Sequence, residues 1–203
     1  VSGITASNKT YDGNTNSTTD VTSAVYTGLV SGDNFVVAAT GTFNNKNVGT
    51  GKTVTVSAIT LSDGSNGGVA SNYSISAGQT TTANITAKSL TVSGITASNK
   101  TYDGNTNATT DVSSASYSGL LSGDNFVVSA TGTFDNKNVG TGKTVTLSSS
   151  YSGSDVSNYS VTNQSSTTAN ITAKALTVSG IIASDKSYDG STTATLGTSN
   201  ILY

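Results

Sequence analysis

The chain contains no cysteine, histidine, tryptophan, methionine or proline, and all of its acidic residues are aspartate and all of its basic residues lysine. These absences leave no imidazole base, no thiolate nucleophile and no zinc site of the usual kind. A Ser–Lys or Thr–Lys neighbour arises here from composition alone, because serine and threonine are so frequent. We therefore predict that the chain is not an enzyme and that it has no catalytic residues, no cofactor-binding residues and no metal ligands.

Charge and apolar runs are equally sparse. Nine lysines and eleven aspartates give a net charge of -2, and no two lysines are adjacent, so nucleic acid is not an expected partner. The longest apolar runs, such as residues 35–39, are far too short to insert into a membrane. Because Val1 is no initiator and the chain lacks cysteine, we expect an internal piece of a longer exported protein, extracellular or on a bacterial cell surface.

The residues that are abundant indicate an all-β fold. Glycine, serine, threonine and asparagine separate short apolar groups such as residues 35–37 and 54–56, and no window shows a helical apolar stripe. Helix is predicted nowhere. The expected strands of the first module are residues 1–6, 23–26, 34–42, 52–60, 72–76 and 82–87.

An internal repeat is the main signal in the sequence. Residues 1–16, VSGITASNKTYDGNTN, recur unchanged 91 positions later, and the matching spacing falls to 86 before Asn158. The second copy has thus lost five residues between Thr146 and Asn158, which predicts a surface turn there and equal strand counts in the two copies. We predict two modules at residues 1–88 and 89–174 and a partial third repeat at 175–203.

Each module has the length of one small β domain, and its turn signals recur at the spacing typical of sandwiches and barrels. Residues 85–92 contain neither glycine nor proline, so the boundary is expected to stay strand-like and to hold the modules as an elongated rod. The predicted core of the first module is Ile4, Tyr11, Tyr26, Leu29, Phe35, Val37, Phe43, Val48, Val54, Val56, Tyr73, Ile75 and Ile85.

A Tyr-Asp-Gly motif occurs once in every copy. We interpret it as structural, with the tyrosine packed into its module and Asp-Gly forming a tight turn, although a tyrosine beside a carboxylate also suits a sugar. The motif residues are Tyr11, Asp12, Gly13, Tyr102, Asp103, Gly104, Tyr188, Asp189 and Gly190.

A calcium loop and an intramolecular isopeptide bond are two alternative interpretations of the polar runs. Residues 12–16 with Asp20 place oxygen side chains at alternate positions, as a calcium loop does, but Ser17 and Ser23 stand where the EF-hand pattern has glycine and glutamate. An isopeptide bond would need a buried lysine against an asparagine. Lysines in runs such as residues 45–47 are instead expected to be solvated.

Residues 9–15, with Phe43 and residues 45–52, resemble the YDG and MBG-type repeat domains of large secreted bacterial adhesins, including two-partner-secreted, filamentous-haemagglutinin-like proteins. The resemblance covers both full modules. It implies tandem Ig-like β-sandwich modules used as stalk or fibre units, with no catalytic residues. The chain departs from this family in lacking proline, which many such repeats place near the closing strand.

The expected function is therefore a structural stalk or spacer of a bacterial surface or secreted adhesin or fibre. The alternatives are a repeat module that binds carbohydrate or ice weakly, and a subunit of a self-assembling filament. The expected partners are neighbouring repeats, with other copies in a fibre or a glycan or cell-surface ligand as alternatives, and no membrane insertion. Because about 29 residues are too few for a core, the third repeat should pair with an edge of module two or with a neighbouring molecule.

Overall fold

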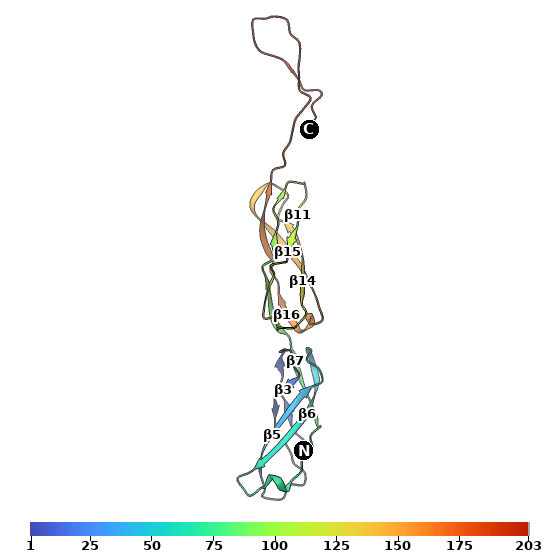
Figure 1. Ribbon diagram of the computed structural model, residues 1–203, viewed down its shortest axis with the longest axis vertical. Coiled ribbons are helices and arrows are strands. Elements are labelled where there is room, and N and C mark those ends of the chain that lie inside the picture. The colour runs from blue at the N-terminus through green and yellow to red at the C-terminus, as the bar shows by residue number, and fades with distance from the viewer. Residues whose placement is uncertain (203) are drawn as a thin grey trace.

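The computed structural model describes residues 1–202 and is nearly all-β, which confirms the all-β part of the predicted fold class. α-Helix is absent from this range, and two short 3-10 turns, η1 (Ala70–Asn72) and η2 (Val156–Asn158), interrupt the strands. No helix of residues 1–202 has the length and apolar character to cross a bilayer. Figure 1 shows the two β-rich modules one after the other along the long axis, with the C-terminal segment beyond them.

Module one is built on a five-stranded sheet of order β2-β7-β6-β5-β3. A long antiparallel hairpin forms its centre, and β2 joins β7 in parallel. A two-stranded sheet pairs β1 with β4. The strands are β1 (Thr5–Ala6), β2 (Lys9–Thr10), β3 (Asn16–Ser17), β4 (Thr19–Asp20), β5 (Phe35–Phe43), β6 (Gly49–Asp63) and β7 (Thr80–Thr86).

Module two repeats both sheets, with the orders β10-β17-β15-β14-β11 and β12-β9. It adds a three-stranded sheet, β13-β8-β16, in which β8 is the central strand. The strands are β8 (Lys88–Ser93), β9 (Thr96–Ala97), β10 (Lys100–Thr101), β11 (Asn107–Ala108), β12 (Thr110–Asp111), β13 (Ser116–Ser118), β14 (Val127–Phe134), β15 (Gly140–Ser152), β16 (Tyr159–Thr162) and β17 (Ser166–Thr172).

The core follows from strict alternation along the central strands. In β6 and β15 every second residue around Val54 and Val145 is buried while its neighbours face solvent, as a half-buried strand requires. The core is complete in module two, where Phe126, Val128 and Tyr159 are buried. Of the predicted core of module one, the buried members are Ile4, Tyr11, Phe43, Val54, Val56 and Ile85, and the half-buried members are Tyr26, Leu29, Phe35, Val37, Val48, Tyr73 and Ile75.

The prediction of equal strand counts is wrong, because module one lacks the third sheet within the described residues. Residues 73–76, predicted as a strand, are irregular, whereas their counterparts form β16. The partner explains the difference. β16 pairs with Lys88–Thr91 of β8, which come from the end of the preceding repeat, whereas residues 73–76 have no strand partner among residues 1–202.

The five-residue shortening lies where the sequence places it. β6 has 15 residues and β15 has 13, and the turn that leads to the 3-10 helix is also shorter in module two. Part of the difference lies inside the hairpin, where Thr40 and Gly41 pair with Ala58 and Val56 across a β-bulge that module two lacks. The remainder lies at the end of the hairpin and in the turn after it, so the prediction of a single shortened turn holds only in part.

The third repeat does not pair with module two, so that part of the prediction is wrong. Its described strands, β18 (Ile182–Ala183) and β19 (Leu196–Gly197), pair with each other, and Ser179 bridges Leu202. Leu176 is 70% exposed, and Figure 1 shows this segment as an open loop beyond module two. Tyr203 lies outside the described residues.

Candidate functional site: the contact between the two modules

Each Tyr-Asp-Gly turn is closed by a lysine two positions before its tyrosine. The Lys9 ammonium donates to Asp12 Oδ1 at 2.7 Å, to the Asn14 carbonyl at 2.9 Å and to the Asn16 carbonyl at 2.9 Å. The turn itself needs glycine, because Gly13 has φ +80°.

The other two copies use the same arrangement. Lys100 holds Asp103 at 2.8 Å, and Lys186 holds Asp189 at 2.7 Å. Gly104 and Gly190 again have positive φ.

The lysine stands where a calcium ion would stand in a calcium loop. The oxygen atoms of residues 12–16 converge on the Lys9 ammonium, which also lies 5.6 Å from the centre of the Phe43 ring. A cation there would have to displace a positive charge that already satisfies these oxygens. Residues 1–202 also contain no cluster of three or more His, Cys, Asp or Glu side chains placed to hold a metal.

The expectation that the lysines are solvated is wrong for these positions. The side chains of Lys9 and Lys100 are 17% exposed and that of Lys143 is 9% exposed. Lys143 donates to Asn136 Oδ1 at 2.8 Å and forms an ion pair with Asp135 at 2.7 Å. Each of these ammonium groups pairs with an aspartate whose side chain is 46–47% exposed, and the ion pair offsets the desolvation of the lysine charge.

The tyrosine of the first motif faces the second module. We call the end of a module that carries the Tyr-Asp-Gly turn its tip, and the opposite end, which carries Asp33 in module one and Asp124 in module two, its base. Tyr11 is 1% exposed, and its hydroxyl donates to Asp124 Oδ2 at 2.9 Å. Its ring packs edge-on against Tyr159, with centroids 5.6 Å apart.

Glycine brings the tip close to the base. A Cβ on Gly13 would lie 3.3 Å from Leu121 Cδ1 of module two, whereas one on Gly104 would meet nothing within 4 Å. The first motif therefore packs against a neighbouring module, and the second has no such neighbour within residues 1–202.

Lys46, in the loop beside the motif, carries the electrostatic part of the contact. Its ammonium forms ion pairs with Asp124 at 3.2 Å and with Asp155 at 3.1 Å. It also lies 5.7 Å from the centre of the Tyr11 ring. Both carboxylates are largely buried, so the lysine neutralises charges that would otherwise be costly to desolvate.

An asparagine pair completes the contact. Asn158 is 1% exposed, and its Oδ1 accepts a hydrogen bond from the backbone N–H of Val48 at 3.0 Å. Its Nδ2 donates to Asn47 Oδ1 at 3.3 Å. A buried carboxamide satisfied from the neighbouring module fixes the relative position of the two.

The contact shifts the pKa values of its groups. The pKa of Asp155 is lowered to about 2 by the Asn125 backbone N–H, the Ser154 hydroxyl and Lys46, in that order. Burial, followed by the nearby Asp124 carboxylate, raises the pKa of Tyr159 to about 12. The pKa of Lys46 is raised by the Tyr11 hydroxyl and by the two carboxylates.

The same residue types occur at the outer ends without this partner. Tyr102 is half-buried, Val139, the counterpart of Val48, is 55% exposed, and Tyr188 is 98% exposed. Sequence reasoning placed Tyr11 inside its own module and missed its contact with module two. The available signal was the recurrence of Asp33 as Asp124 and of Tyr73 as Tyr159, which turn formation alone does not require.

A comparison with protein-family models gives a match to the YDG domain at residues 1–83 and again at 86–169. The chain belongs to the YDG domain family. No curated protein and no solved structure matches it. The two matched segments fall on the two YDG modules described above, and the contact of Tyr11 with Asp124 joins them.

Proposed function

We propose that the chain is a non-catalytic spacer, in which YDG modules with an Ig-like β-sandwich fold are stacked tip to base as a stiff rod. It belongs to an extracellular or surface-attached bacterial adhesin or fibre, and its partners are neighbouring repeats. Its role is to set the distance between the parts of that larger protein that flank it.

The observation that carries this proposal is the contact at Asp124. Its carboxylate accepts from the hydroxyls of Tyr11 and Tyr159 and pairs with Lys46, so groups from both modules meet at one buried charge. Domains that move independently on flexible linkers would not form such a buried polar network with each other. Ala87, the single residue between β7 and β8, leaves little free chain to act as a hinge.

The composition supports the same role. Near-identical copies add length without adding chemistry, and the sequence lacks the histidine, cysteine and glutamate on which most catalytic sites depend. The Tyr-Asp-Gly motif recurs unchanged in all three copies, and its residues form a tight turn and, at Tyr11, the contact with module two.

The rod is tested by measuring the distance between two spin labels. The chain has no cysteine, so Thr55→Cys and Thr146→Cys, at exposed equivalent positions, provide one label in each module. We expect a single narrow distance distribution in the parent chain. Adding Asp124→Ala should broaden it, because the shared acceptor is lost.

The matched control is Asp33→Ala, which removes the equivalent carboxylate from the outer base and should leave the distribution narrow. A broad distribution in the parent chain would show that the modules move independently and would refute the spacer mechanism.

A further inference from the structure

Lys46 differs from the other lysines that form ion pairs within residues 1–202. It pairs with two aspartates, Asp124 at 3.2 Å and Asp155 at 3.1 Å, and their side chains are only 5% and 12% exposed. One amine therefore lies between two carboxylates that are shielded from water. Each of the other lysines pairs with a single aspartate whose side chain is 46–56% exposed, and these lysines are Lys9, Lys100, Lys143 and Lys186.

Two tyrosine hydroxyls donate to one oxygen of Asp124. The Tyr11 hydroxyl lies 2.9 Å and the Tyr159 hydroxyl 2.6 Å from Asp124 Oδ2. The Lys46 ammonium lies 3.2 Å from the other oxygen, Oδ1. When an amine attacks a carboxyl carbon, negative charge develops on the oxygen that stays behind. The two hydroxyls already point at Oδ2, as the donors of an oxyanion hole do.

Asp155 has one oxygen held by its own module and one that faces Lys46. Its Oδ2 accepts from the Asn125 backbone N–H at 3.0 Å and from the Ser154 hydroxyl at 2.9 Å. Its Oδ1 lies 3.1 Å from the Lys46 ammonium. A carboxylate at this distance can take a proton from the amine and pass it to a leaving oxygen.

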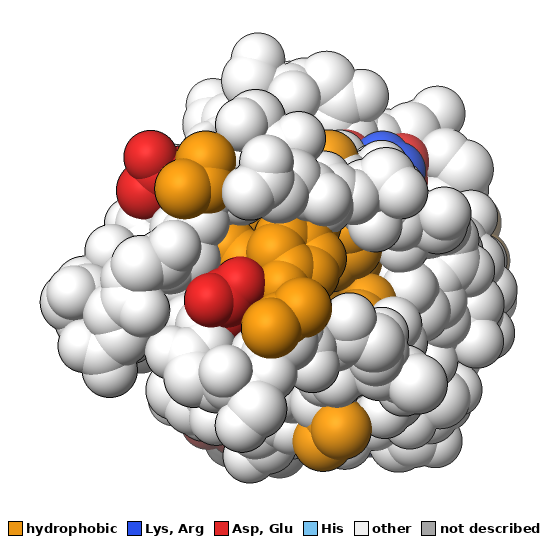
Figure 2. Space-filling view, turned by 90° about the horizontal axis from the view of Figure 1, so that it is seen from below, with side chains coloured by type: hydrophobic (Ala, Val, Ile, Leu, Met, Phe, Trp, Pro, Cys, Tyr) orange, Lys and Arg blue, Asp and Glu red, His pale blue; other side chains and the backbone are white. Residues whose placement is uncertain are grey.

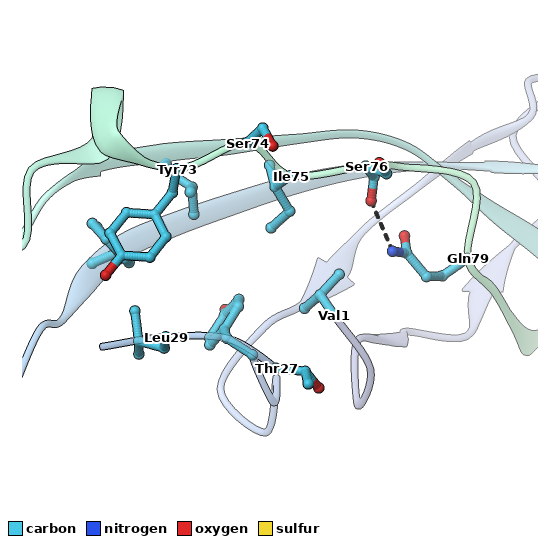
Figure 3. Close-up of a pocket in the computed structure, with 11 residues that line it drawn as sticks. Val1, Thr27, Leu29, Tyr73, Ser74, Ile75, Ser76 and Gln79 are labelled. Atoms are coloured by element: carbon cyan, nitrogen blue, oxygen red, sulfur yellow. Dashed lines mark hydrogen bonds between the residues drawn. The ribbon is translucent and has the colours of Figure 1, made fainter. Parts of the chain in front are cut away.

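Module one has part of this arrangement at its own base. The Tyr73 hydroxyl donates to Asp33 Oδ2 at 2.7 Å, which is the geometry of the equivalent pair in module two. Figure 3 shows the Tyr73 ring bordering a cavity, and Figure 2, which views the molecule from this base, shows an acidic side chain beside a hydrophobic hollow. At the place of Asp155 module one has Val69. The second carboxylate thus distinguishes the base of module two.

We propose that Lys46 and Asp124 form an intramolecular amide bond that joins the two modules covalently. Proton transfer from the ammonium through Asp155 to Asp124 Oδ1 leaves a neutral amine beside a neutral carboxyl group, and the amine attacks the carboxyl carbon. The bond that forms is Nζ–Cγ, and the bond that breaks is Cγ–Oδ1. Both protons that the nitrogen loses end on Oδ1, which leaves as water, and Asp155 returns to its ionised form. The step therefore consumes nothing from outside the contact.

The fold makes this condensation feasible, because it holds the amine and the carboxyl group together and so replaces a bimolecular encounter. The resting groups are ionised. Hydrogen bonding, from the Asn125 backbone N–H above all, lowers the pKa of Asp155 to about 2, and the Tyr11 hydroxyl raises the pKa of Lys46. The neutral pair is therefore rare, so freshly purified chain keeps the ion pair and the bond accumulates as the sample ages. The bond goes beyond the spacer role, which needs only the noncovalent contact.

Peptide mapping by mass spectrometry tests the proposal on the full chain. After prolonged incubation at neutral pH, the digested parent chain should contain a branched peptide that joins residues 46 and 124 and is one water lighter than its two parts. Lys46→Arg should contain none, because arginine keeps the charge but stays protonated. The matched control Lys137→Arg, at the exposed counterpart in module two, should form the branched peptide as the parent chain does.

Three further substitutions test the role of each group. Asp155→Asn should slow the accumulation of the branched peptide by about 100-fold or more, because a carboxamide does not carry the proton. Tyr159→Phe should slow it by about 100-fold, because one oxyanion donor is lost. Asp124→Asn should give a branched peptide that has lost one ammonia in place of one water, since the leaving group on the attacked carbon is then nitrogen.

Circular dichroism of each variant shows that it is folded. A folded parent chain that never forms the branched peptide would overturn the proposal, as would equal accumulation in Asp155→Asn, or a bond from Lys46 to Asp155 instead of Asp124. None of these results would change the spin-label distance in freshly purified chain. The covalent bond and the spacer function therefore fail separately.

Discussion

Modules one and two have nearly the same sequence but differ at their bases, where only module two has a three-stranded sheet among the described residues. Both modules have the long central hairpin, and Val54 and Val145 are fully buried at its inward face. At the base they diverge, because Phe126 and Tyr159 are buried in module two while Phe35 and Tyr73 are half-buried in module one. The difference teaches that the structural unit is not the unit of repetition: a closed module includes the last residues of the preceding repeat.

The largest effect is expected at the strand that distinguishes the modules. Leu90→Ala should lower the free energy of unfolding of module two by about 2–5 kcal/mol, because it leaves a cavity around a fully buried side chain. The matched change Leu176→Ala, at an exposed leucine, should cost less than about 0.5 kcal/mol in the monomer. Urea denaturation followed by circular dichroism measures both, and equal costs would contradict the comparison.

A second comparison sets the tyrosine at the contact against its counterpart at the outer tip. Tyr11→Phe should destabilise the two-module unit by about 1.5–3 kcal/mol, because it removes a hydrogen bond to the buried Asp124 carboxylate. Tyr102→Phe should have little effect, since Tyr102 is only half-buried at the outer tip of module two. Thermal unfolding of the two variants gives the difference, and a larger loss from Tyr102→Phe would refute it.

Gly119, which packs against β8, and its counterpart Gly28 in module one provide a third, smaller contrast. Gly119→Ala and Gly28→Ala both place alanine at positive φ, which costs about 1 kcal/mol. Only Gly119→Ala also drives a Cβ against the backbone of β8, so it should cost about 1 kcal/mol more. Hydrogen exchange of the β8 amides should rise in Gly119→Ala alone. Matching exchange in the two variants would show that β8 does not determine the difference.

The pH dependence of the contact is the smallest expected effect. The pKa of Asp155 is lowered to about 2. Its contribution to the free energy of unfolding is therefore complete above the ordinary aspartate range and is lost as the pH falls through about 2. The pKa of Tyr159 is raised to about 12. Its contribution to the free energy of unfolding is therefore complete at pH values below its ordinary pKa of 10.0 and is lost as the pH rises through about 12.

The titration of Tyr159 is measured at alkaline pH as the difference in phenolate absorbance between the parent chain and Tyr159→Phe. A tyrosine that titrates at its ordinary pH would contradict the buried contact. At acid pH the contact is measured by the distance between the spin labels in the two modules. This distance should change between about pH 4 and pH 2 in the parent chain but not in Asp155→Asn.

The sequence was sufficient to predict the parts of the fold that depend on local patterning. The predicted strand at residues 34–42 corresponds to β5, and the alternation around Val54 correctly assigns the inward face of β6. The repeat comparison also located the shortened turn. These features are encoded by residues close to one another along the chain, which is why alternation and turn residues reveal them.

Features that depend on distant residues were missed. Residues 73–76 have the sequence of a strand, but hydrogen-bonding partners decide whether they form one, and β16 has its partner while they do not. Tyr11 finds its acceptor at Asp124, more than a module away in sequence. The buried position of Lys9 was missed as well, although a lysine precedes each motif aspartate by three residues in all three copies.

The short step from β7 to β8 has a mechanical consequence. Only Ala87 separates them, and β8 is the central strand of its sheet, parallel to β16 and antiparallel to β13. A pulling force along the chain therefore passes from module one into a strand that is bonded on both sides. Its hydrogen bonds are loaded together in shear rather than opened one after another, and a tether built in this way resists tension until many bonds give way at once.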